Sequence, residues 1–148
     1  MPTLHLHTTV VLDDTARSAL ARALTDLTAE VLAKRPEVTA VLLHHHQPGQ
    51  WFIGGVSAEA QPTAQLAIDI TTGTNSADEK AAFVAGAWQL LNRALGGTTG
   101  LDPASYVIVR EIPATDWGYG GITQQARHSG AGFTGDLGVP GAAAQTAK

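Results

Sequence analysis

Apolar and polar positions divide the first half of the chain into strand, helix and strand. Polar and apolar side chains alternate over residues 3–9 (TLHLHTT), which is the pattern of a strand with one buried face. A helix is predicted from Asp13 to Lys34, because leucines and a valine recur there every three or four positions. Pro36 ends this helix, and residues 38–46 (VTAVLLHHH) form the second strand.

The second half repeats the same series. Residues 65–72 (QLAIDITT) and 105–112 (SYVIVREI) are predicted as strands. The helix between them opens with SADE, a capping-box sequence in which Ser76 and Glu79 satisfy two backbone donors. A glycine pair at 96–97 ends that helix.

Two matching segments indicate an internal duplication. Thr8-Thr9 recurs as Thr71-Thr72, and the segment WFIGG at 51–55 recurs as WGYGG at 117–121. An aromatic residue followed by a glycine pair, found at the end of each series, is a specific signal. We therefore expect one domain over 1–148, repeats at 2–55 and 64–121, and a Gly-, Ala- and Gln-rich arm or tail at 122–148.

The predicted fold class is α+β. Each β-α-β unit implies two parallel strands joined by a right-handed crossover. Two units give a four-stranded sheet with both helices on one face. The other face would be bare in a monomer, and an exposed apolar sheet favours assembly around a shared axis.

Composition narrows the class of protein. Of 148 residues 44% are hydrophobic and 15% are charged, with a net charge of -4 and no basic block, so we expect no nucleic-acid partner. The chain has no cysteine, which excludes disulfides and thiol catalysis. No apolar run is long enough to cross a membrane, and the N-terminus lacks the pattern of a signal peptide. The expected location is cytoplasmic.

Several motifs together resemble a known family. A start Met-Pro, a β-α-β unit and an aromatic-x-x-Gly-Gly turn resemble the 4-oxalocrotonate tautomerase subunit, and two copies resemble the fused members of the tautomerase (MIF-like) superfamily. The segments GQWFIGG (49–55) and TNSADEK (74–80) are similar to the cis-3-chloroacrylic acid dehalogenase group. Asp116-Trp117 and FTGD at 133–136 are similar to the malonate semialdehyde decarboxylase group.

The resemblance implies a homotrimer that acts on a small molecule without a cofactor. Removal of Met1 would free the secondary amine of Pro2 as general base and acid, in keto–enol isomerisation of a small 2-oxo acid or enol. An α-amino group has a pKa of about 8, and burial lowers it toward working pH. The alternatives are dehalogenase, hydratase or decarboxylase activity on the same scaffold, or a non-catalytic trimer.

The remaining candidate residues stand where the family holds substrate, and several depart from its pattern. One family arginine falls at Asn75 and the dehalogenase's glutamate falls near Gly118. Only two side chains of the run 44–46 (HHH) share a strand face, so no metal site is expected. The candidates for substrate binding are Trp117, Arg110, Asn75, Tyr119 and His44.

Overall fold

The structure of the protein is a computed structural model that describes residues 1–130 of the chain. The described residues form two compact units, residues 1–112 and residues 113–130. The segment 133–136 and most of the predicted arm lie outside the described residues.

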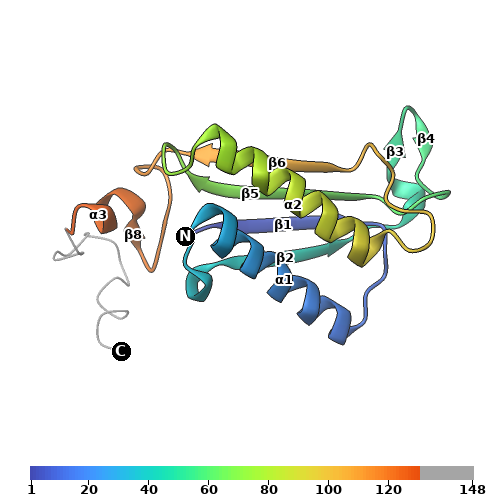
Figure 1. The fold of residues 1–148 in the computed structure, drawn as a ribbon, viewed down its shortest axis with the longest axis horizontal. Coiled ribbons are helices and arrows are strands. Elements are labelled where there is room, and N and C mark those ends of the chain that lie inside the picture. Colours follow the sequence, from blue (N-terminus) through green and yellow to red (C-terminus); the bar gives the residue numbers. More distant parts are fainter. Residues whose placement is uncertain (131–148) are drawn as a thin grey trace, which may run out of the picture. The chain divides into compact units, whose positions relative to one another are not determined.

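The first unit is built around a mixed four-stranded sheet (Figure 1). The main elements are β1 (Thr3–Thr8), α1 (Asp14–Leu32), β2 (Ala40–His45), β5 (Ala64–Thr71), α2 (Ala77–Leu95) and β6 (Tyr106–Ile112). The order of the strands in the sheet is β2-β1-β5-β6: β1 runs parallel to β2, β5 parallel to β6, and β1 antiparallel to β5. This confirms the predicted α+β class and the duplicated β-α-β units.

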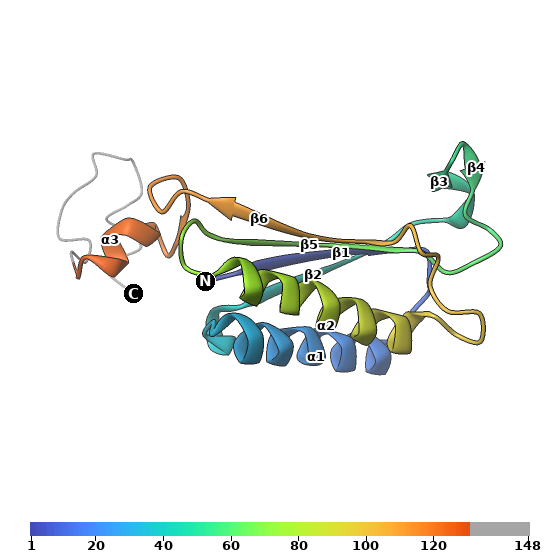
Figure 2. The same ribbon diagram turned by 45° about the horizontal axis from the view of Figure 1, so that its top comes forward.

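Both helices cover the same face of the sheet (Figure 2). The core between the two layers consists of alternate strand side chains and one stripe of each helix, which is the arrangement that their periodicities require. None of the described helices is long and apolar enough to span a bilayer. Fully buried core residues include Leu4, Leu6, Leu24, Leu66, Ile68, Phe83 and Leu91.

The helix ends follow local chemistry. Asp13 caps α1 by accepting a hydrogen bond from the Ala16 amide at 2.8 Å. The predicted capping box at Ser76 and Glu79 is present. Helix α1 ends at Leu32, two residues before its predicted end, because Ala33 adopts a left-handed conformation (φ 55°) that stops the helix before the proline at 36.

Each of the two glycine pairs that follow an aromatic residue, at 54–55 and 120–121, forms the turn of a short hairpin. In the first unit β3 (Phe52–Ile53) pairs with β4 (Val56–Ser57), and both intervening glycines have positive φ. In the second unit β7 (Gly118–Tyr119) pairs with β8 (Ile122–Thr123) through a glycine pair of the same conformation. Two consecutive residues with positive φ make the hairpin turn that matches strand twist, which explains the glycines.

The beginning of the predicted arm carries structure that its composition did not indicate. A short helix, α3 (Gln124–His128), follows β8 directly. The Thr123 hydroxyl caps it by accepting a hydrogen bond from the Ala126 amide at 3.2 Å. A single capped turn is too short to show an apolar period, so this helix was missed.

The face of the sheet opposite the helices is more polar than expected. Alternation places Thr3, His5 and His7 of β1 there, beside Asp69 of β5 and Arg110 of β6. Apolar side chains also occur on this face: Leu42 is 40% exposed and Tyr106 is 62% exposed. The open face is therefore a mixed surface and not the apolar one on which the assembly argument was based.

Candidate functional site

Pro2 directly precedes β1, and its ring is fully buried. Its carbonyl accepts a hydrogen bond from the Ala40 amide at 3.2 Å, which ties the start of the chain to the start of β2. The strand alternation places the ring on the same side as Leu4, toward the helices. Burial at this point would favour the neutral form of an amine on the Pro2 nitrogen.

Asn75 lies between the end of α1 and the start of α2, at the end of the sheet where Pro2 lies. Its amide Nδ2 donates to the Leu32 carbonyl at 3.0 Å and to Glu79 Oε2 at 2.8 Å. Two hydrogen bonds lower the pKa of the Glu79 carboxyl: the one from the Asn75 side chain has the larger effect, and the one from the Ser76 amide adds to it. Asn75 therefore links the end of α1 to the capping box of α2 and has both amide hydrogens engaged.

Arg110 also lies at this end, on the open face, and forms a two-point ion pair. Its Nε donates to Asp69 Oδ1 at 2.8 Å and its second nitrogen to Asp69 Oδ2 at 3.3 Å. The Thr3 hydroxyl donates to the same carboxylate at 3.1 Å. A substrate carboxylate at Arg110 would have to compete with Asp69.

His44 belongs to a cluster of four histidines on the open face. Its ring stacks on His7 with centroids 4.4 Å apart and on His5 at 5.4 Å. The ring nitrogens of His5 and His44 lie 3.2 Å apart, and those of His7 and His46 lie 2.7 Å apart. His44 pairs with His7, five residues along β1 from Pro2, or roughly 16 Å at the usual strand rise. The structure therefore does not bring His44 to Pro2.

This histidine cluster was missed because the two strands were considered separately. His5 and His7 have the same spacing as His44 and His46, and parallel pairing of β1 with β2 brings the two sets together. Burial, then the neighbouring His44, His46 and His5, lower the pKa of His7. Within residues 1–130, no group of three or more potential ligands is arranged to hold a metal ion.

Trp117 and Tyr119 lie in the second unit. The Trp117 carbonyl accepts a hydrogen bond from the Gln124 amide at 2.9 Å, and its buried Nε1 has no partner among the described residues. The Arg127 guanidinium sits 3.7 Å from the centre of the Tyr119 ring and donates to the Tyr119 carbonyl at 2.6 Å. These contacts fix the hairpin and α3 to each other within the unit.

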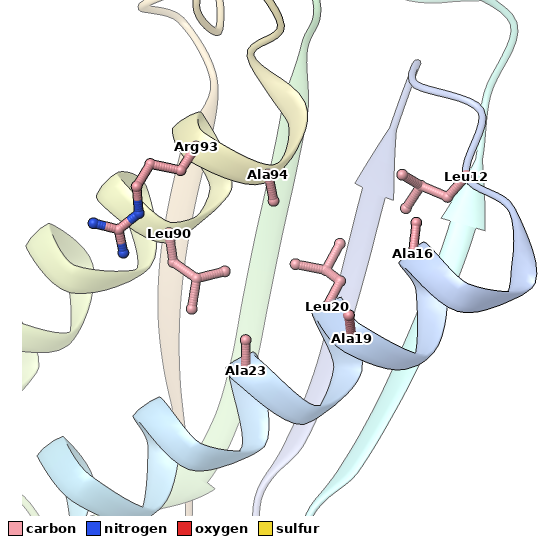
Figure 3. Close-up of a pocket in the computed structure, with 8 residues that line it drawn as sticks. All are labelled: Leu12, Ala16, Ala19, Leu20, Ala23, Leu90, Arg93 and Ala94. Carbon is pink, nitrogen blue, oxygen red and sulfur yellow. The ribbon is translucent and has the colours of Figure 1, made fainter.

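A groove of about 450 Å³ runs between the two helices (Figure 3). It lies near the start of α1 and the end of α2, the end of the helices remote from Pro2. Its lining is apolar apart from one cation. The lining residues are Leu12, Ala16, Ala19, Leu20, Ala23, Leu90, Arg93 and Ala94.

Comparison with known proteins agrees with this architecture. Residues 9–61 match the family model for the tautomerase enzymes. A search among curated proteins returned no significant match.

Solved structures match over both repeats. A native fused 4-OT is 26% identical, with a TM-score of 0.73 over 84% of this chain and 97% of the other. The wild-type fused 4-OT "Q0", a symmetric trimer, is 24% identical, with a TM-score of 0.73 over 84% of this chain and 98% of the other.

A third structure, a macrophage migration inhibitory factor homologue from Prochlorococcus marinus, shares the fold. It is 19% identical, with a TM-score of 0.66 over 82% of this chain and 97% of the other. The family match and the fold shared with the fused 4-OT structures support the assignment of this chain to the tautomerase superfamily, with the fused 4-OT-like architecture.

Proposed function

We propose that this protein is a cofactor-independent tautomerase that interconverts the keto and enol forms of a small 2-oxo acid, with the Pro2 amine as general base and acid. The observation that carries the proposal is the position of Pro2, fully buried at the start of the first strand of a tautomerase-type fold. Removal of Met1 would convert the Pro2 nitrogen from an amide to a secondary amine.

The reaction asks for one group that takes a proton and returns it. The neutral Pro2 amine removes a proton from an enol oxygen or from the carbon next to a carbonyl. The resulting ammonium then protonates the other end of the conjugated system. An amine with a pKa near working pH serves both steps, and burial brings an α-amino group in that direction.

Assembly as a homotrimer is part of the proposal. The fused 4-OT "Q0" that shares this fold is a symmetric trimer. The open face of the sheet also carries exposed apolar side chains, Leu42 and Tyr106, which association would cover. Light scattering showing a stable monomer at micromolar concentration would contradict this part.

The catalytic part is tested by ketonisation of phenylenolpyruvate and 2-hydroxymuconate. Intact mass should show that the active protein lacks Met1, and Pro2→Ala should lose most of its turnover. Pro62→Ala is the matched control, because Pro62 follows Gln61 within the chain and its nitrogen is an amide without basicity. Full activity in protein that retains Met1 would exclude the amine mechanism.

A further inference from the structure

The histidine cluster consists of His5, His7, His44 and His46, and the proposed reaction uses none of these side chains. The rings form a continuous series: centroids lie 5.4 Å apart between His5 and His44, 4.4 Å between His44 and His7, and 5.0 Å between His7 and His46. The cluster lies on the open face of the sheet, and both helices cover the other face (Figure 2). All four residues are nevertheless half-buried, because the rings shield one another from water.

Two contacts between ring nitrogens limit how many protons the cluster can hold. They join His5 Nδ1 to His44 Nε2 at 3.2 Å and His7 Nδ1 to His46 Nε2 at 2.7 Å. A hydrogen bond in such a pair needs one nitrogen that carries a proton and one that does not. Two imidazolium rings would point two N–H groups at each other, so a second proton on a pair breaks its hydrogen bond. Like charges at these ring distances also disfavour protonation.

Among residues 1–130, no opposite charge is paired with the cluster. The residues of β5 opposite its two members on β1 are Ala67 and Gln65, and none of the ion pairs includes a ring of the cluster. The charged side chains of β5 and β6 on this face, Asp69 and Arg110, are bonded to each other. Beside the cluster, Trp51 makes a T-shaped contact with the nearest ring. The lowered pKa of His7, caused first by burial and then by the other three rings, agrees with this lack of a counter-charge.

The cluster lies in the part of the open face that assembly would cover. His5 pairs in register with Leu42, whose side chain is 40% exposed, and His44 follows Leu42 on the same face of β2. A neighbouring copy that covers Leu42 therefore also covers these two rings. A neutral imidazole tolerates such burial, whereas an imidazolium without a counter-charge is strongly disfavoured by the loss of water.

We propose that the histidine cluster makes assembly of this chain depend on pH: copies associate through the open face while the rings are neutral and separate when the rings are protonated. The proposal rests on the homotrimer of the proposed function and adds the condition under which it forms. In separated chains water reaches the rings, which then bind protons that the covered rings exclude. Assembly is therefore complete above the ordinary histidine pKa of about 6.5 and weakens as the pH falls below it.

Sedimentation velocity of the full chain between pH 7.5 and pH 5 measures the state of assembly, and far-UV circular dichroism in the same buffers measures the fold. We expect trimers at pH 7.5 and separated chains that keep their helical signal at pH 5. If each chain takes up one proton on separation, the association constant of the trimer should fall on the order of 1000-fold per pH unit below the pKa of the separated rings.

The double variant His7→Gln, His44→Gln removes the two central rings and keeps polar side chains, so it should remain assembled at pH 5. A second double variant, His5→Gln, His46→Gln, removes the outer ring of each pair and should behave in the same way. The matched control is His45→Gln, because His45 is exposed and points to the other face of β2. It should separate at the same pH as the wild type.

Trimers that persist unchanged from pH 7.5 to pH 5 would overturn this proposal and leave the homotrimer intact. Separated chains already at pH 7.5 would contradict the homotrimer and this proposal together. The proposal would also be overturned if both double variants separate at the wild-type pH, if neither assembles at pH 7.5, or if separation occurs only with loss of the helical signal. Pro2-dependent turnover of the wild type at pH 7.5 reports on the proposed reaction independently of these outcomes.

Discussion

Arg110 and Asp69, 41 residues apart in the chain, form a two-point ion pair across neighbouring parallel strands. The Asp69 side chain is only 13% exposed, whereas that of Arg110 is 55% exposed. The pair therefore shields a carboxylate that the fold holds close to the surface of the sheet. Arg110, a candidate for substrate binding from the sequence, has a structural partner in its own chain.

We expect Arg110→Ala to lower the free energy of unfolding by about 1–2 kcal/mol, because Asp69 would keep only the Thr3 hydroxyl as a partner. Denaturant unfolding at fixed protein concentration measures this. Glu37→Ala is the control: it removes an exposed ion pair with Arg35, which solvent screens, and should lower the free energy of unfolding less than Arg110→Ala does. Unchanged stability with a raised KM for a carboxylate substrate would instead assign Arg110 to binding.

Stability should fall as the solution is acidified below pH 6.5. The pKa of His7 in the folded protein lies below its ordinary value of 6.5, so the unfolded chain binds more protons in this window. The contribution of neutral His7 to the free energy of unfolding is complete above pH 6.5. It is lost as the pH falls from 6.5 toward the pKa of His7 in the folded protein. The groups facing His7 are His44 on β2, His46 directly after β2, His5 on its own strand and Gln65 on β5.

His7→Gln is the variant that tests this cause. It removes the titrating ring while keeping a polar side chain, so the dependence of the melting temperature on pH between 5 and 7 should become shallower. His45→Gln, whose side chain is exposed and points to the other face of β2, is the matched control. Equal slopes in wild type and His7→Gln would contradict the assignment.

The capping box of α2 should contribute measurably to stability. Ser76→Ala removes the hydrogen bond that its hydroxyl accepts from the Glu79 amide at 3.1 Å, and we expect a loss of about 1 kcal/mol. Thr123→Ala removes the equivalent cap of the five-residue α3, in the second unit, and should cost less in global unfolding. Thermal unfolding of the two variants compares the losses of stability. A larger loss of stability in Thr123→Ala than in Ser76→Ala would contradict this prediction.

Efficient dehalogenation of cis-3-chloroacrylate is not expected. Hydration of the double bond needs a group that activates water, and the position where the resemblance puts that carboxylate is Gly118. A Cβ built at Gly118 would overlap the Ile122 carbonyl across the hairpin, so no side chain fits there without rearrangement. Gly118→Glu should disturb the hairpin and still release no chloride, whereas rapid Pro2-dependent chloride release by the wild type would show that other residues supply this role.

Local sequence patterns predicted the elements of the first unit closely. The alternation at residues 3–9 and the helical stripe after Asp13 depend on which face of each element is buried, and this period is present in the sequence itself. The same holds for the capping box at Ser76, which is formed by neighbours in the chain. The β-α-β connection then dictated parallel pairing within each repeat. The role of Pro2 remains a prediction that these patterns and the family resemblance support.

Only the tertiary structure decided how the repeats join and which side chains meet. The antiparallel register of β1 against β5 sets Thr3 beside Asp69, and no periodicity within either strand specifies that pairing. The same is true of His7 against His46 and of Lys34 against Thr74. The physical reason is that a repeating pattern records burial of each element separately, whereas a contact between distant residues depends on the register and packing of the whole fold.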